Sequence, residues 1–334
     1  MPPIEGPKLV KELSRPEIVM GVARVPGGRR LIFGGSDFQV HDVDFAAEKP
    51  EPKALGSHES YVTGVAVAAG GKLAVSGGYD GKLVWWNLES GSKVRSVDAH
   101  TRWIRRVVAT PDGSTVVSVA DDMVARVWDA STGVLKRELK GHQAMTPHHF
   151  PSMLHACTIS ADGTLVATGD KLGHLVVWDL ASGRSLATLE APTLYTWDPV
   201  QRRHSIGGAR ALAFSPDGSL LAAGGSGQIG NIDALEGPPR VEVFDWKAGQ
   251  RTHEFPGEGT KGMVQRLIFR PDGERLVSLG GANDGFVWVL DLKAKAVASQ
   301  EKAPGHLHDA AVGESPDLFF AVGHNRVVAY EFPA

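Results

Sequence analysis

The sequence has little cysteine, little net charge and no long apolar stretch. Cys157 is the only cysteine among 334 residues, which excludes an intramolecular disulfide framework, and we expect it to pack in a strand. No apolar run approaches the ~20 residues of a membrane-spanning helix. The 35 Lys and Arg against 38 Asp and Glu give a net charge of −3, so the overall charge does not attract the chain to nucleic acid or to an anionic membrane. The first five residues lack the basic and apolar segments of a signal peptide, so we expect a cytoplasmic protein.

Residues that form turns are plentiful, with 40 Gly and 20 Pro, and the turns recur at regular steps. The landmark positions are Gly28, Gly71, Gly113, Gly163, Gly218 and Gly273, with Pro316-Asp317 in the seventh place. The shortest step, from Gly71 to Gly113, is 42 residues, and the two longest, from Gly163 to Gly218 and from Gly218 to Gly273, are 55 each. A period in the low forties with some insertions is typical of four short strands per repeat, the unit of a β-propeller blade.

The stretch from His100 to Lys140 shows the repeat unit most clearly. It has a hydrophobic run after His100, a turn at Pro111-Asp112-Gly113, a second run, an acidic turn at Asp121-Asp122 and a third run ending at Trp128-Asp129. A fourth run, residues 134–139, completes the unit. The spacing from His to Trp-Asp resembles the WD40-repeat family, and the resemblance covers nearly the whole chain.

The resemblance implies a tetrad of His, Ser or Thr, Asp and Trp inside each blade, where buried polar atoms need partners. The tetrad is complete twice, as His58, Ser76, Asp80, Trp86 and as His100, Ser118, Asp122, Trp128. In the fourth copy Leu172 stands at the Asp position, although His142, Thr168 and Trp178 remain. Because the other copies lack the full set, we expect plainly apolar interiors there.

The expected fold is therefore an all-β, seven-bladed β-propeller of four-stranded antiparallel blades. We expect residues 1–334 to form a single domain. The last repeat ends after its third strand, and residues 8–13 resemble a fourth strand. We therefore expect an N-terminal strand at about 7–14 to pair with the C-terminal blade at about 305–334. This pairing would remove two open strand edges and close the ring.

Three insertions interrupt the repeat pattern in the fourth and fifth copies, at residues 143–151, 192–208 and 225–239. In the WD40 family, loops of these types share one face, the top face. Function often resides where a regular scaffold is interrupted, so one hypothesis is a partner site there, and tolerated surface elaboration is the other. The candidate contacts in the second insertion are Tyr195, Trp197, Arg202 and Arg203, because aromatic and Arg side chains are enriched in binding hot spots. Trp197 could instead only fix the long loop to the blades.

A second candidate surface comes from the resemblance. Tyr61 and Trp103 each stand three residues after a tetrad His, a position that family members use to bind peptides. Arg102, Arg105 and Arg106 flank Trp103. Because side chains alternate across a strand, Arg105 and Arg106 cannot both face the same way, so only part of this basic cluster can act together.

Motifs of known chemistry are few. Residues 225–230 match G-x-G-x-x-G by letter, but Pro238-Pro239 and a further strand follow, which leaves no helix to receive a pyrophosphate. The neighbouring His148 and His149 could ligate a metal, yet no carboxylate or thiol accompanies them at a zinc-site spacing. No nucleophile elbow, P-loop or H-E-x-x-H pair occurs. We therefore expect no metal, no cofactor and no catalytic residue.

These observations predict a non-catalytic scaffold that presents a rigid propeller face to a protein or peptide partner, with the top-face loops of blades four and five as the first candidate surface. We expect no membrane partner and no nucleic-acid partner, while self-association stays open. The alternative is an enzyme or a small-ligand or metal-binding propeller that uses the mouth of the central channel. Its possible contacts are His148, His149, Asp233 and Arg202.

Overall fold

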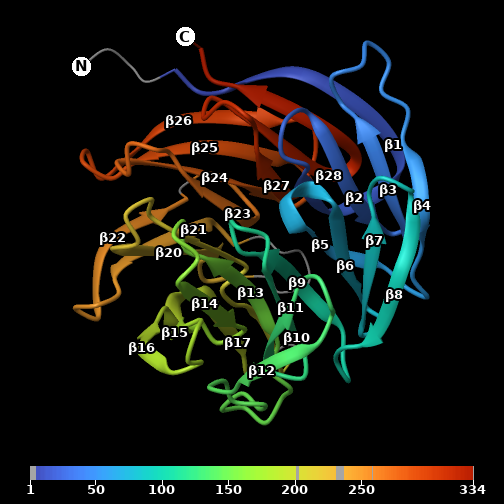
Figure 1. Ribbon diagram of the computed structural model, residues 1–334. Coiled ribbons are helices and arrows are strands. Elements are labelled where there is room, and N and C mark those ends of the chain that lie inside the picture. The colour runs from blue at the N-terminus through green and yellow to red at the C-terminus, as the bar shows by residue number, and fades with distance from the viewer. Residues whose placement is uncertain (1–4, 201–202, 231–236, 258, 334) are drawn as a thin grey trace. The chain divides into compact units, whose positions relative to one another are not determined.

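The computed structural model describes residues 5–200, 203–230, 237–257 and 259–333 (Figure 1). These residues are almost all strand and turn, with two short 3₁₀ segments at Ala69–Gly71 and Pro192–Leu194. Within the described ranges, no helix is long and apolar enough to cross a membrane. The chain divides into two compact units. We call residues 5–6 with Gly141–Leu307 the central unit, and Pro7–Lys140 with residues 308–333 the terminal unit.

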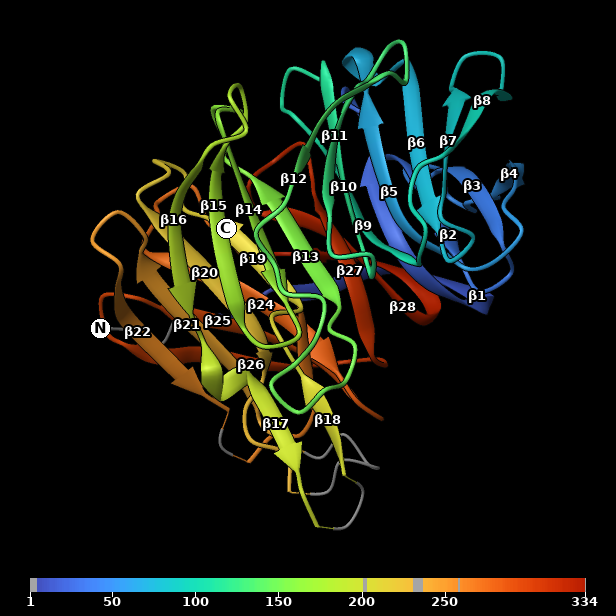
Figure 2. The same cartoon turned by 90° about the horizontal axis from the view of Figure 1, so that it is seen from below.

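The central unit holds three four-stranded antiparallel sheets, each with its strands in chain order. The first is β13 (Leu154–Ile159), β14 (Leu165–Asp170), β15 (His174–Asp179) and β16 (Ser185–Glu190); the second is β19 (Ala211–Phe214), β20 (Leu220–Ser226), β21 (Pro239–Asp245) and β22 (Gln250–Pro256); the third is β23 (Met263–Phe269), β24 (Arg275–Gly281), β25 (Gly285–Asp291) and β26 (Ala296–Ala303). A separate hairpin, β17 (Tyr195–Asp198) and β18 (His204–Gly207), extends past the ends of β13–β16 (Figure 2).

The terminal unit holds two four-stranded sheets and most of a six-stranded one. The four-stranded sheets are β5 (Val62–Ala68), β6 (Leu73–Gly78), β7 (Lys82–Asn87) and β8 (Ser92–Asp98), followed by β9 (Ile104–Ala109), β10 (Thr115–Ala120), β11 (Ala125–Asp129) and β12 (Leu135–Leu139). The six-stranded sheet has the order β27 (Leu307–Val312), β28 (Leu318–Glu331), β1 (Lys8–Arg24), β2 (Arg30–Gly35), β3 (Gln39–Asp44) and β4 (Lys53–Ser57).

Within each four-stranded sheet, the residue types of a strand explain how deeply that strand is buried. The second strand is buried on both faces, as in β10, where all six residues are buried. The fourth strand is half-exposed and carries charges, as in β12, where only Leu139 is buried. The turn between first and second strands needs a left-handed residue, and Gly113 has φ 69°. Its missing Cβ also lets the turn approach the backbone of Ala69 in the preceding sheet. The apolar inner strands therefore form the core, and the loops are held at fixed positions.

The expected count of seven separate blades is wrong. Among the described residues there are six sheets of four or more strands, and the expected first and seventh copies are joined in the six-stranded sheet. The physical cause is β1, which runs without a break over 17 residues. Its first part pairs with β28, from Lys8 opposite Glu331 to Ile18 opposite His324, and its second part pairs with β2, from Val19 opposite Gly35. The described residues thus form an all-β propeller fold with six sheets of four or more strands, five of which are four-stranded and antiparallel, and the separate β17–β18 hairpin.

Two expectations about blade interiors are also wrong. The sequence placed Leu172 at the Asp position of the fourth repeat, which predicted a tetrad without a carboxylate. In the structure Asp170, at the end of β14, supplies the carboxylate, and its Oδ2 lies 2.9 Å from His142 Nδ1. The carboxylate reaches the histidine from the strand itself, because Asp170 occupies the register position of Gly78 in β6. The fifth repeat has a fully buried Glu242 between Arg240 (2.7 Å) and Arg251 (3.1 Å). Its interior is therefore charged, since paired charges are tolerated inside.

Candidate interaction surfaces

The two predicted tetrads form matching hydrogen-bond chains inside the terminal unit. His58 Nε2 lies 2.7 Å from Ser76 Oγ, His58 Nδ1 lies 2.9 Å from Asp80 Oδ2, and Trp86 Nε1 donates to Ser76 Oγ at 2.8 Å. The second chain has the same geometry: His100 lies 2.7 Å from Ser118 and 3.1 Å from Asp122, and Trp128 donates to Ser118 at 2.9 Å. Each chain ties the loop before the first strand to the second and third strands.

Of the two tetrad aspartates, Asp122 has the larger shift in pKa. Burial by itself raises the pKa of this carboxyl, but the hydrogen bonds and charges of His100 and Arg126 outweigh burial and lower the pKa. Arg126 Nη1 donates to Asp122 Oδ2 at 2.7 Å, and its Nη2 lies 2.8 Å from Glu138. Burial also lowers the pKa of His100, although Asp122 opposes this. Both groups therefore bind fewer protons in the folded chain than in the unfolded one.

This linkage predicts that stability falls in acid. A carboxyl whose folded pKa lies below its unfolded value of about 3.9 contributes stability above that value and loses it as pH falls further. We expect Asp122→Asn to be less stable than wild type at pH 7, and the gap to shrink below about pH 4. Denaturant unfolding of both proteins between pH 7 and pH 2.5 measures the gap. A gap that stays constant to pH 2.5 would contradict the assignment.

An exposed row of aromatic side chains lies beside these tetrads. Ring centroids are 5.5 Å apart for Phe38 and Tyr61, 5.7 Å for Tyr61 and Tyr79, and 4.2 Å for the parallel pair of Tyr79 and Trp103. Phe38 is 40%, Tyr61 39% and Trp103 48% exposed. We call Phe38, Tyr61, Tyr79 and Trp103 the aromatic row. Three large exposed aromatic side chains in one continuous row form an apolar patch of the kind that marks interaction sites.

Arg105 fixes the row in place. Its guanidinium lies 5.2 Å from the Tyr79 ring and 5.3 Å from the Trp103 ring, and it donates to Tyr79 Oη at 2.9 Å. The same guanidinium donates to both Asp121 oxygens, at 2.8 and 2.7 Å. Neighbouring Arg106 instead donates to buried Asp309 at 2.7 Å, so the two arginines act separately, as strand alternation requires. Arg102 is exposed next to Trp103.

Sequence reasoning missed Phe38 and Tyr79, and it named Arg105 beside Trp103 without its contact to Tyr79. A signal was available, because Phe38 directly follows Asp37 and Tyr79 directly precedes Asp80, in the turns between second and third strands. These turns lie near the loops that carry Tyr61 and Trp103: Tyr79 N donates to the Tyr61 carbonyl, and Asp121 N donates to that of Trp103. An aromatic residue next to the turn aspartate therefore falls beside an aromatic residue three positions after the tetrad His.

The insertions of the central unit pack against one another. His148 of the first insertion stacks on Trp197 of the second at 4.1 Å between centroids, and its Nδ1 lies 3.0 Å from Tyr195 Oη. Gln228 of the third insertion donates to the Tyr195 carbonyl at 3.0 Å, and Ile229 N donates to the hydroxyl of Thr196. Trp197 and Tyr195 are thus largely used in holding the loops together, so their aromatic area is only partly available to a partner.

The other predicted site residues of the central unit have few described contacts or lie outside the described residues. Arg203 is exposed and has a positive φ of 49°, next to residues outside the described ranges. Arg202 and Asp233 lie outside the described residues. His148 is used by the Trp197 stack, and His149 is exposed with φ 63°. Among the described residues of the insertions, the exposed large apolar side chains are Met145 at 49% and Val200 at 81%.

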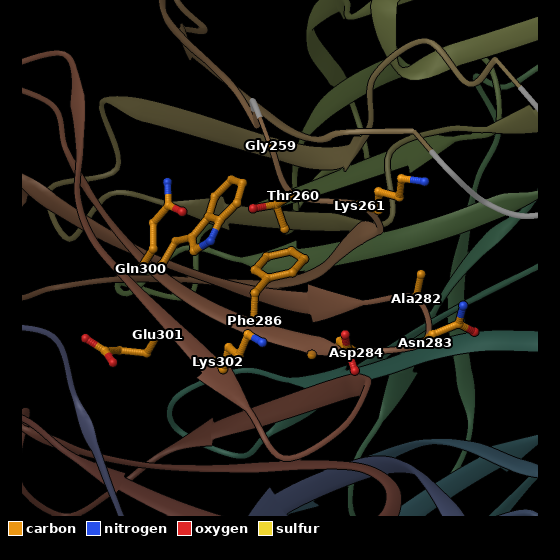
Figure 3. Close-up of a pocket in the computed structure, with 12 residues that line it drawn as sticks. Gly259, Thr260, Lys261, Ala282, Asn283, Asp284, Phe286, Gln300, Glu301 and Lys302 are labelled. Atoms are coloured by element: carbon orange, nitrogen blue, oxygen red, sulfur yellow. The ribbon is translucent and has the colours of Figure 1, made fainter.

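The central unit also contains a cavity of about 580 Å³ beside β25 and β26. Figure 3 shows the Phe286 ring in the middle of it, with Lys261 and Asn283 on one side and Gln300 on the other. The floor is aromatic, because Phe286 lies 4.7 Å from Trp288 between ring centroids. Among the described residues, its charged lining residues are two lysines and two acids, Lys261, Lys302, Asp284 and Glu301. None of the sequence-predicted site residues that the structure describes is among these lining residues.

Comparison with known proteins agrees with the geometry. The family described as WD domain, G-beta repeat matches residues 51–87, 91–129, 133–179 and 197–229. The small ribosomal subunit protein RACK1 of Caenorhabditis elegans is 33% identical over 308 residues, which are 77% of this chain and 86% of that protein. Nuclear distribution protein PAC1 of Arthroderma otae is 30% identical over 218 residues, and the Trichophyton verrucosum protein of that name is 28% identical. The chain covers 44% of the length of these PAC1 proteins.

Four-stranded antiparallel sheets with buried His–Ser–Asp–Trp chains define a protein built from propeller-blade repeats. The matched repeats and the extent of the likeness to RACK1 give the particular family: this chain belongs to the WD40-repeat proteins.

Proposed function

We propose that this protein is a non-catalytic interaction scaffold and that the aromatic row binds a protein or peptide partner. The observation that carries the proposal is the exposure of Phe38, Tyr61 and Trp103 in one row. Large rigid aromatic side chains lose little conformational entropy on binding and are enriched in hot spots. The tetrads hold the loops that carry them, so the free protein already has the binding geometry. Likeness to a named ribosomal-subunit protein supports a role in an assembly.

The test compares partner binding by a Tyr61→Ala, Trp103→Ala double variant with wild type. We expect the double variant to bind at least about tenfold more weakly, because truncated hot-spot aromatics each cost more than about 1 kcal/mol. The control is Val134→Ala, which removes a 61% exposed apolar side chain from the same unit outside the row. Affinity capture with cross-linking identifies the partner, and a binding isotherm with the purified partner gives the dissociation constants.

All three proteins must first show the same thermal unfolding midpoint. If the double variant and Val134→Ala retain the partner equally, the aromatic row is not the binding surface. Cross-links from the partner to the insertions of the central unit would then favour the second candidate surface. That candidate rests on the exposed Met145 and Val200, beside three insertions that already pack together. Self-association is distinguished by a mass measurement in solution.

The alternative function is binding of a small ligand, and the cavity beside β25 and β26 is the observation that favours it. Its size falls within the range of small-molecule sites, and an aromatic floor with a few polar groups is their usual lining. Ligand-induced quenching of tryptophan fluorescence that disappears in Trp288→Phe would support this alternative. For location, we propose the cytoplasm, because the chain is similar to a protein named for the small ribosomal subunit.

A further inference from the structure

The sheet of β1–β4 has an unusual polar cluster where the neighbouring sheets have a tetrad. Asp37 precedes Phe38, whose φ is 69°, just as Asp122 precedes Met123, whose φ is 64°. Asp37 therefore occupies the place of the tetrad aspartate. Phe33 pairs with His41 in the register position where Ser118 pairs with Arg126, so the hydroxyl of the tetrad is missing. A different set of polar groups, Glu17, Asp37 and His41, gathers at this place.

The geometry of these three side chains is that of a ligand set. One ligand atom from each lies within 4.8 Å of the others. His41 Nε2 lies 2.7 Å from Asp37 Oδ2 and 3.9 Å from Glu17 Oε1. The His41 ring is held by stacking on Phe33, at 5.0 Å between centroids. Three donors on two strands and one turn are therefore already close together.

The charge balance of the cluster is incomplete. Glu17 is 4% exposed at its side chain, and Arg15 Nε donates to its Oε1 at 2.7 Å. Its other oxygen, Oε2, is buried and has no hydrogen-bond partner in the described structure. A buried carboxylate oxygen without a partner is costly. Two carboxylates face one guanidinium and one imidazole here, whereas the single carboxylate of Asp122, in the β9–β12 tetrad, has both His100 and Arg126.

We propose that Glu17, Asp37 and His41 bind a divalent transition-metal ion, represented by Zn²⁺. One imidazole nitrogen and two carboxylate oxygens are a ligand set that Zn²⁺ accepts, with water in the remaining position. The ion adds positive charge beside the Glu17 carboxylate, whose Oε2 has no partner, and takes the place that a proton has between His41 and Asp37. Asp37 is 24% exposed at its side chain and provides the route from solvent. Arg15 orients Glu17 without occupying its second oxygen.

The experiment uses the full chain, freed of metal by a chelator and then titrated with Zn²⁺ while bound metal is counted by mass spectrometry. We expect one Zn²⁺ per chain and a higher thermal unfolding midpoint, and no comparable effect from Mg²⁺ or Ca²⁺, which prefer all-oxygen sites. Glu17→Gln and Asp37→Asn should each weaken this binding by at least about tenfold. The visible spectrum of Co²⁺ in the same site gives an independent signature of nitrogen and oxygen ligands.

The matched control is Asp42→Asn, which changes the next carboxylate along β3, one that pairs with Arg30 rather than with the cluster. It should bind Zn²⁺ like wild type, and every variant should show a single cooperative unfolding transition in chelator. Because the chain has 13 His in total, binding elsewhere must be separated from this site by the variants. Absence of a stoichiometric ion, or equal Zn²⁺ affinity in wild type, Glu17→Gln and Asp37→Asn, would overturn the proposal.

Discussion

Replacement of Asp122 by Ala is expected to destabilise the protein by about 3 kcal/mol, which is the lower end of the range for removing one partner of a buried ion pair. The carboxylate accepts hydrogen bonds from His100 and Arg126, and its side chain is 9% exposed. Its removal leaves the Arg126 guanidinium 2.6 Å from His100 Nδ1 with no anion between them. Water has little access to replace the lost oxygen atoms. The free energy of unfolding in denaturant, for wild type and variant, measures the effect.

The control for this change is Glu89→Ala, in the exposed turn after β7. Substitutions at exposed positions away from special contacts usually change stability by less than about 0.5 kcal/mol. We therefore expect Glu89→Ala to melt like wild type and Asp122→Ala to melt several degrees lower. Equal midpoints for the two variants would mean that the tetrad does not stabilise the blade.

Gly285→Ala is expected to be similarly severe, at about 3 kcal/mol, for a steric reason. A Cβ at this position would overlap the carbonyl oxygen of Gly305 and lie 2.8 Å from Ala303 Cβ. The obstacle is backbone, which cannot move aside as the tip of a flexible side chain can, and forced overpacking costs 1–3 kcal/mol or more. Gly285 pairs with Ala303 at the end of β25 and β26, so the strain falls on the sheet that lines the cavity. Thermal unfolding midpoints measure the cost.

Gly28→Ala provides the comparison for this second change. An added Cβ at Gly28 meets no atom within 4 Å, so the substitution requires no movement of neighbours. Alanine also restricts the unfolded chain, which offsets part of any loss. We expect its midpoint to match wild type within the range of ordinary surface changes. If Gly285→Ala is as stable as Gly28→Ala, the close approach of β25 to Gly305 does not exist in solution.

Strand periodicity and turn residues were sufficient to predict most of the local structure. The repeat unit from His100 to Lys140 forms four strands at the expected places, because Gly and Asp at its turns fix the backbone there. The joining of the first and last copies into one sheet could not be predicted, since it depends on β1 continuing from Ile18, its last position paired with β28, to Val19, its first position paired with β2. Local propensity does not specify which distant strand supplies the hydrogen bonds.

For the candidate surfaces too, the sequence predicted single residues, and the structure decided which of them lie together. Tyr61 and Trp103 were identified from their distance to the tetrad histidines, but their link through Tyr79 and Arg105 depends on two loops of adjacent sheets. Trp197 was a candidate contact in the sequence, whereas the structure stacks it on His148, 49 residues earlier in the chain (197 − 148). Exposure of an aromatic side chain is a property of its neighbours in space, and a sequence does not contain that information directly.

The sequence by itself determined the class of strand, the turns, the two complete tetrads and the WD40 resemblance, because each depends on residues within one repeat. Only the tertiary structure decided the number of sheets, the use of Asp170 as the tetrad carboxylate of the fourth repeat, and the close approach of Glu17, Asp37 and His41. Each of these depends on which strands pair and on how far a side chain reaches across the pairing. Hydrogen bonding and packing between distant segments set those distances, and local sequence patterns do not.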